Sequence, residues 1–225
     1  MLNNSMAELG CDRPEIILKL ARNQIPAGET LLGSFLFWRE FMERTDTAIE
    51  VEFVLKAQLN DEVIEEKIDE FQTEKPWTSE DGQIVEFSFS YEIPQWLPVS
   101  THAIRYYVRP KLSLNEPTRS AEEFLNLEAI IVQPNQDQVR VLQALHKLGF
   151  QEKLDSRYWN GRYQEFDFTA GKESSFGIRE LTVLFHPEQD STQVHLYPDQ
   201  REPISFTLPE NQDLVASLGK VFLHR

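Results

Sequence analysis

Two of the five histidines, His186 and His195, are spaced so that they could bind a metal ion together. They flank a turn, and both imidazoles point outward from neighbouring strands if the apolar side chains between them face the core. A zinc site needs three or four ligands, and only Glu188 or Asp190 is near in sequence. We therefore interpret both as ordinary surface histidines, and we expect neither a metal nor a cofactor.

The acidic run over residues 61–74 holds seven carboxylates and one lysine. Calcium loops place their oxygen ligands at alternate positions around a glycine, and this run has neither the spacing nor the glycine. The run is typical of a solvated acidic face. The alternative is a docking surface for a basic partner, whose candidate residues are Glu62, Glu65, Glu66, Asp69 and Glu70.

Motifs of enzymes are absent from the chain. It has no G-x-S-x-G, G-x-x-x-x-G-K, G-x-G-x-x-G or H-E-x-x-H. The single cysteine, Cys11, lies in a weakly patterned start, where a thiol lacks the rigid electropositive surroundings that lower its pKa. Paired carboxylates for glycoside cleavage lie far apart along a chain, so sequence alone does not exclude them. We expect a protein that is not an enzyme.

The four tryptophans, Trp38, Trp77, Trp96 and Trp159, all fall at predicted strand ends or in turns. Platforms that stack bases or sugars normally have basic or mixed polar neighbours. We interpret all four as core residues near the corners of a sandwich.

The composition excludes several classes of partner. The 22 basic and 37 acidic side chains give a net charge of −15, which disfavours nucleic acid and anionic lipid. Residues 1–133 hold 12 basic and 24 acidic side chains (−12), and residues 134–225 hold 10 and 13 (−3). The longest apolar run, residues 31–38, is far shorter than the roughly 20 residues that cross a bilayer. With one cysteine and no signal-peptide pattern, a cytoplasmic location is expected.

A single capped helix separates two strand-rich stretches. Asn135 is a candidate N-cap with Gln138 three residues later, Asp137 falls in the first turn, Lys147 in the last, and Gly149 supplies the stop. These signals predict a helix over residues 135–149. We expect one β-domain over residues 1–133 and a second, opening with this helix, over residues 134–225.

Alternating apolar and polar residues predict the strands. Residues 62–72 are ambiguous, because their apolar side chains have helical spacing although their neighbours in sequence are strands. The Asn160-Gly161 pair is the strongest hairpin signal, and residues 211–223 fit a terminal amphipathic helix. The predicted strands are residues 15–21, 31–38, 48–59, 83–91, 102–108, 124–132, 152–159, 162–169, 178–186, 193–197 and 204–208.

Five short segments carry a family resemblance. Residues 25–33 (IPAGETLLG) and 93–100 (IPQWLPVS) are similar to the "PGE-x-V-x-G" segment and the "LP-x-x-x-P-x-S" turn of arrestin-like domains. Residues 141–150 (VLQALHKLGF), 163–168 (YQEFDF) and 180–185 (ELTVLF) follow in the order of "V-L-x-A-x-x-x-L-G-F", "Q-E-F-E-F" and "L-E-V-V-F". The set resembles the bacterial sporulation-control (SpoOM) family over about residues 14–208.

The resemblance implies two arrestin-like antiparallel β-sandwich domains joined near the helix. It also implies a non-enzymatic regulator or adaptor that acts through protein contacts. Two alternatives stay open: a small-molecule or metal-binding enzyme with a dispersed site, and a structural protein that self-associates through its edge strands.

Overall fold

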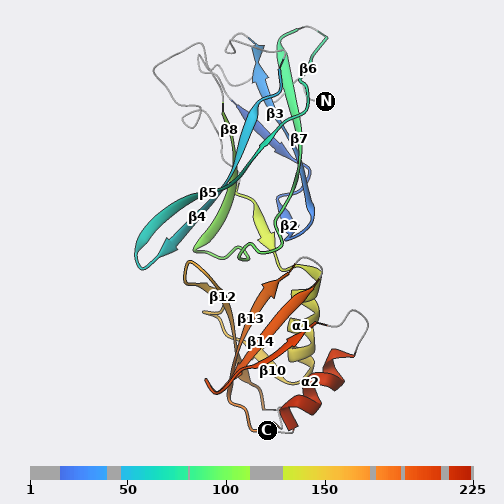
Figure 1. The fold of residues 1–225 in the computed structure, drawn as a ribbon. Coiled ribbons are helices and arrows are strands. Elements are labelled where there is room, and N and C mark those ends of the chain that lie inside the picture. The colour runs from blue at the N-terminus through green and yellow to red at the C-terminus, as the bar shows by residue number, and fades with distance from the viewer. Residues whose placement is uncertain are drawn as a thin grey trace.

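In the computed structural model, two β-rich parts are stacked end to end (Figure 1). The structure describes residues 16–39, 47–80, 82–111, 129–172, 176–188, 191–208 and 213–223. We call strands β1 to β9 the N-terminal part, and the elements from helix α1 onward the C-terminal part. The protein is mainly β with two helices among the described residues, which confirms the predicted fold class.

Two antiparallel sheets build the N-terminal part. The first has the order β1 (Ile17–Leu20), β3 (Thr30–Trp38), β7 (Ile84–Glu92), β6 (Trp77–Thr78). The second has the order β5 (Glu62–Gln72), β4 (Glu50–Leu59), β8 (Ile104–Lys111). A short parallel sheet pairs β2 (Gln24–Pro26) with β9 (Ile131–Gln133), and β9 leads into the C-terminal part.

Aromatic rings join the two sheets into a sandwich. The ring of Tyr91 on β7 lies 4.9 Å from that of Phe53 on β4 and 4.6 Å from that of Phe71 on β5, measured between centroids. Phe35 and Phe87 from the first sheet belong to the same buried cluster as Phe53. Side chains that alternate along each strand thus close one core between two sheets.

The ambiguous segment, residues 62–72, is strand β5. It pairs with β4 along its whole length, and the two-residue turn between them has positive φ at Asn60 (48°) and Asp61 (67°). The register shifts between Phe53 and Val54, which lie opposite Asp69 and Lys67, so Ile68 is the extra residue of a β-bulge. The bulge brings Ile64, Ile68 and Phe71 to the core side, and this produces the spacing that resembles a helix.

One antiparallel sheet and two helices build the C-terminal part. The sheet order is β10 (Phe150–Glu152), β12 (Gln164–Ala170), β13 (Glu180–Pro187), β14 (Thr192–Pro198), β15 (Ile204–Thr207), and β11 (Tyr158–Trp159) also pairs with β12. Helices α1 (Gln136–Lys147) and α2 (Leu214–Leu223) lie on the same side of this sheet and supply its second layer (Figure 1). The division into domains at residues 133 and 134 stays a prediction.

The helix signals are confirmed in detail. The backbone N–H of Gln138 donates to Asn135 Oδ1 at 2.8 Å, and the Asn135 N–H donates to Gln138 Oε1 at 2.9 Å. Gly149 follows with φ of +87°, a conformation that favours glycine. The terminal helix forms as well, although it begins at Leu214.

The predicted strand over residues 152–159 is wrong. The chain forms β10 and β11 with a turn between them, in which the Ser156 N–H donates to the Lys153 carbonyl at 3.2 Å, and Arg157 adopts a left-handed conformation with φ of +67° just before β11. The hairpin at Asn160-Gly161 is confirmed, since β11 pairs with β12 across it and Gly161 has φ of +91°. Of residues 124–132, those before 129 lie outside the described residues.

Candidate functional site

Strand β5 distributes the five predicted docking carboxylates over two faces. Glu65 and Glu70 lie opposite Lys56 and Glu52, on the face turned away from the core. Glu62, Glu66 and Asp69 lie opposite Leu59, Leu55 and Phe53, on the core side, where an edge strand leaves them exposed. The segment is therefore not one acidic face. Its role as a docking surface stays a prediction.

Cations of the neighbouring strands neutralise the outward carboxylates. Arg109 on β8 donates to Glu52 Oε2 from Nε at 2.9 Å and from Nη2 at 2.7 Å, and from Nη1 to Glu65 Oε1 at 2.8 Å. Lys56 lies 2.9 Å from Glu65, and Lys111 pairs with Glu70. The outward face is a ladder of ion pairs across three strands.

These ion pairs lower the pKa of two carboxyls. Burial acts to raise the pKa of Glu52, but the hydrogen bonds and charges of Arg109 and Lys111 outweigh it, and the pKa falls below its usual value. The hydrogen bond from Lys56 lowers the pKa of Glu65, against a smaller opposing effect of burial, and Arg109 lowers it further. Both groups therefore favour the folded state most when they are ionised.

We expect Arg109→Met to lower the free energy of unfolding by about 1–2 kcal/mol at pH 7, because it leaves the half-buried Glu52 without its main partner. The stability from a lowered carboxyl pKa is present above the unfolded value of about 4.5 and is lost as the pH falls through the folded value. The difference between wild type and variant should therefore shrink at pH 3. Urea unfolding at both pH values measures it. Arg105→Met, on the same face of β8, is the control, and an equal loss there would contradict the assignment.

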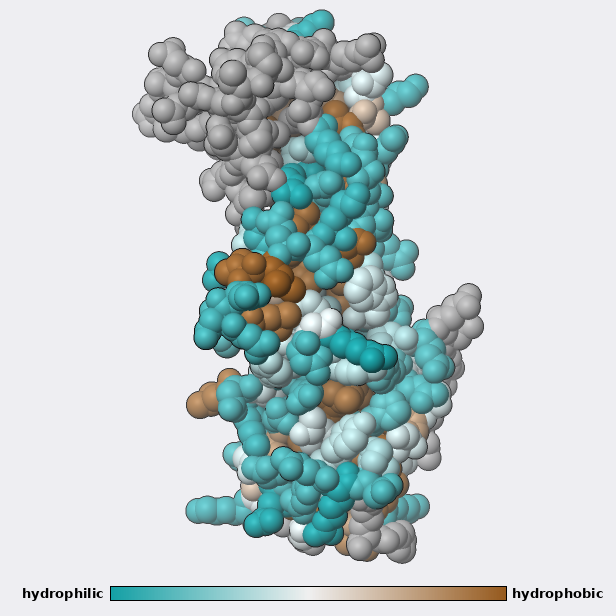
Figure 2. Space-filling model, turned by 60° about the vertical axis from the view of Figure 1, so that its left-hand side comes forward, coloured by the Kyte–Doolittle hydropathy of each residue, from teal (hydrophilic) through white to brown (hydrophobic). Residues whose placement is uncertain are grey.

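The core-side carboxylates have different surroundings. Asp69 Oδ2 accepts a hydrogen bond from the Tyr91 hydroxyl at 3.3 Å, and burial and this aspartate raise the pKa of Tyr91. Glu62 and Glu66 make no ion pair with the residues that the structure describes. Figure 2 shows a mostly hydrophilic surface with hydrophobic side chains gathered at the level of the β4–β5 hairpin, where Val63 is 76% exposed.

The histidine pair forms, without a third ligand. The rings of His186 and His195 lie 5.2 Å apart, and His195 Nδ1 lies 2.7 Å from Ser205 Oγ. Burial, together with His195 and Arg162, lowers the pKa of His186. Within the described ranges, no group of three His, Cys, Asp or Glu side chains could hold a metal ion. Cys11 and Asp190 lie outside those ranges.

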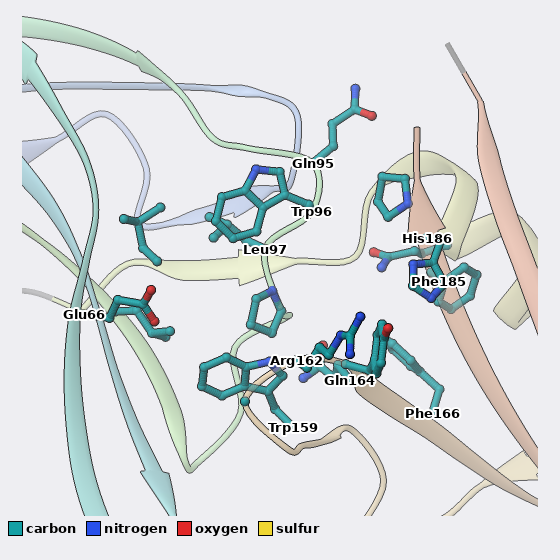
Figure 3. Close-up of a pocket in the computed structure, with 17 residues that line it drawn as sticks. Glu66, Gln95, Trp96, Leu97, Trp159, Arg162, Gln164, Phe166, Phe185 and His186 are labelled. Atoms are coloured by element: carbon teal, nitrogen blue, oxygen red, sulfur yellow. The ribbon is translucent and has the colours of Figure 1, made fainter. Parts of the chain in front are cut away.

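A pocket of about 280 Å³ opens where the two parts meet (Figure 3). Leu55, Glu66 and Ile68 line it from the β4–β5 hairpin. The turn over residues 95–98 adds Trp96 and Pro98, and the C-terminal part adds α1, the β11–β12 hairpin and the end of β13. We call it the junction pocket.

Gln164 lines the junction pocket and forms hydrogen bonds to the main chain of both parts. Its Oε1 accepts from the Val99 N–H at 2.6 Å, and its Nε2 donates to the carbonyls of Val99 at 2.9 Å and Arg157 at 3.0 Å. Nearby, the buried Tyr106 hydroxyl donates to the Pro98 carbonyl at 2.6 Å, and burial raises the pKa of that hydroxyl. The turn that carries Trp96 is thus held from both parts.

The tryptophans do not all belong to the core. Trp159 is 9% exposed and reaches from the C-terminal part into the N-terminal core cluster. Trp77 and Trp96 are each 59% exposed, so their predicted core role is wrong. The Pro-rich turn around Trp96 presents the ring outward, and an exposed indole at a pocket rim is typical of a binding surface.

Sequence reasoning did not identify the junction pocket, because its residues come from five separate segments. Gln164 lies in one of the family-like segments, and Asn160-Gly161 sets the hairpin that presents Arg162. The family-like segment and the Asn-Gly pair can both be recognised in the sequence alone. Nothing in the pattern around Glu66 or Trp96 indicated that they share a pocket.

Comparisons with known proteins agree with this architecture. A search of curated proteins finds no match. Among solved structures, the chain is similar to the crystal structure of Spo0M, sporulation control protein, from Bacillus subtilis, with a TM-score of 0.65 and 17% identity. The match covers 94% of this chain and 98% of that one, and at this identity it shows the fold. A sequence model of the family described as SpoOM protein matches residues 2–202. The chain therefore belongs to the SpoOM protein family.

Proposed function

We propose that this protein is a cytoplasmic, non-enzymatic regulator or adaptor of the sporulation-control type that acts through protein contacts. The observation that carries the proposal is the exposed Trp96 at the rim of the junction pocket, next to Pro98 and Val99, whose main chain is hydrogen-bonded by Tyr106 and Gln164 from the two parts. Exposed tryptophans beside a preformed pocket are frequent anchors of protein interfaces.

Three further observations support the proposal. Membership of a sporulation-control family suggests a regulatory role. The described residues contain no helix long and apolar enough to cross a membrane. The ladder of ion pairs on β4, β5 and β8 keeps one face of this three-stranded sheet neutral and hydrophilic. Charged side chains on its edge strand β5 limit non-specific strand pairing. Self-association through edge strands stays a prediction.

Quantitative affinity capture tests the proposal. The tagged chain, expressed at its native level, is compared with Trp96→Ala and with the tag alone through several growth phases. We expect a defined partner that the wild type enriches and Trp96→Ala loses, and whose purified form binds the chain directly. Recovery of abundant chaperones only, in every phase, would contradict a role through protein contacts.

A further inference from the structure

The two ends of the junction pocket differ in chemistry. Figure 3 shows Glu66 at one end, Phe185 and His186 at the other, and the rings of Trp96 and Trp159 between them. A volume of about 280 Å³ lies at the lower end of the range of roughly 300–1,000 Å³ that is typical of ligand pockets. The pocket can therefore hold one long side chain.

Glu66 is available to a ligand because of the strand that carries it. Its neighbour Glu65 points to the opposite face and is paired with Lys56 and Arg109. Glu66 points to the core side, where it makes no ion pair or side-chain hydrogen bond with the described residues, and it lines the pocket. The Glu66 carboxylate therefore faces the pocket without an ion pair to any residue that the structure describes.

The indole rings add a second reason to expect a cation. A guanidinium group stacks on the face of tryptophan and binds a carboxylate through two parallel N–H donors. Trp96 and Trp159 line the same pocket as Glu66, the first exposed and the second buried. Among charged side chains, arginine fits this combination of flat rings and one carboxylate best, because lysine carries only a compact point charge.

The charges around the pocket agree with a basic occupant at this end. Glu62 and Asp69 lie on the same face of β5 as Glu66, and residues 1–133 carry a net charge of −12. At the far end, burial, His195 and Arg162 lower the pKa of His186, which disfavours the charged form of that ring. Arg162, whose guanidinium lies 5.0 Å from the Tyr163 ring, leaves donors there for carbonyls of a bound main chain.

We propose that the Glu66 end of the junction pocket binds an arginine side chain of a protein partner, with the guanidinium paired to Glu66 and stacked against Trp96. This inference rests on the proposed function, since it names the surface and the chemistry through which the regulator meets its partner.

Titration with a capped amino acid tests the site directly. Nα-acetyl-arginine methylamide is added to the full-length protein while the indole Nε1–H resonances are followed by NMR. We expect saturable shifts of Trp96 and Trp159 with a dissociation constant on the order of 1 mM, and none of Trp77, which lies outside the pocket. Nα-acetyl-citrulline methylamide, which has the same shape without the charge, should cause no saturable shift.

Two matched variants locate the charge. Glu66 and Glu62 are both exposed on the same face of β5, so neither substitution should disturb folding. Only Glu66 lines the pocket. We expect Glu66→Gln to weaken binding about tenfold, equivalent to about 1.4 kcal/mol. Glu62→Gln removes the same formal charge and should weaken binding less than about twofold, because an exposed charge outside the pocket is screened.

Several results would overturn the arginine site. Equal weakening by Glu62→Gln and Glu66→Gln would show a diffuse electrostatic effect, and equal binding of the citrulline compound would remove the charge requirement. Tighter binding of agmatine than of the capped arginine would assign the pocket to a free small cation. If the captured partner still binds Glu66→Gln with full affinity, the arginine site fails while the regulatory role through protein contacts survives.

Discussion

Replacing Trp159 by alanine is expected to lower the free energy of unfolding by about 3–5 kcal/mol, because it removes a large buried ring and leaves a cavity that the sandwich fills only in part. Trp159 belongs to the C-terminal part, but its side chain is a member of the N-terminal core cluster, together with Leu55 and Tyr106. The variant should therefore also uncouple the two parts, so that calorimetry resolves two transitions in place of one.

Trp77→Ala is the matched control for this result. It deletes the same side chain from β6, where the ring is 59% exposed, and should cost less than about 1 kcal/mol. If both substitutions cost the same, the assignment of Trp159 to the shared core would be wrong.

The second large effect is expected at Gln164. Gln164→Ala removes three hydrogen bonds and leaves the N–H and carbonyl of Val99 without their partner, and we expect a loss of about 2–3 kcal/mol in urea unfolding. Gln164→Glu has almost the same shape and keeps an acceptor for the Val99 N–H, but it cannot donate to the carbonyls of Val99 and Arg157. It should therefore lose at least as much stability at pH 7.

The control for Gln164 is Gln193→Ala, on the outward face of β14, which should change stability by less than about 0.5 kcal/mol. A Gln164→Glu protein as stable as wild type would show that the donated bonds to the two carbonyls contribute nothing to the junction.

The helix that separates the two parts could be predicted because its signals are local. Asn135 and Gln138 lie one turn apart and satisfy each other's backbone N–H, so the capping box depends on no distant residue. The hairpin at Asn160-Gly161 is local in the same way, since the turn requires positive φ at Gly161. The three family segments after residue 140 fall on α1 with β10, on β12 and on β13, elements that form the C-terminal core.

The conformation of β5 could not be predicted, because a bulge changes which side chains face the core. Without the bulge at Ile68, a regular strand places Glu66 and Glu70 beside Ile64 and Ile68, and the apolar spacing favours a helix. Pairing with β4 overrides that local preference, as tertiary contacts often do. The same bulge places Glu70 on the face of the ion-paired Glu65, opposite Glu66, which has no ion pair among the described residues.

The sequence by itself determined the β-rich class, the helix at residues 136–147 and the family, because caps, turns and alternation act between near neighbours. Only the tertiary structure decided what the acidic and aromatic residues do. Glu66, Trp96 and Trp159 lie 30 or more positions apart, and they meet because two separate core clusters close against each other at the junction. A side chain's partners across such an interface depend on packing and register over the whole chain, which local patterns do not record.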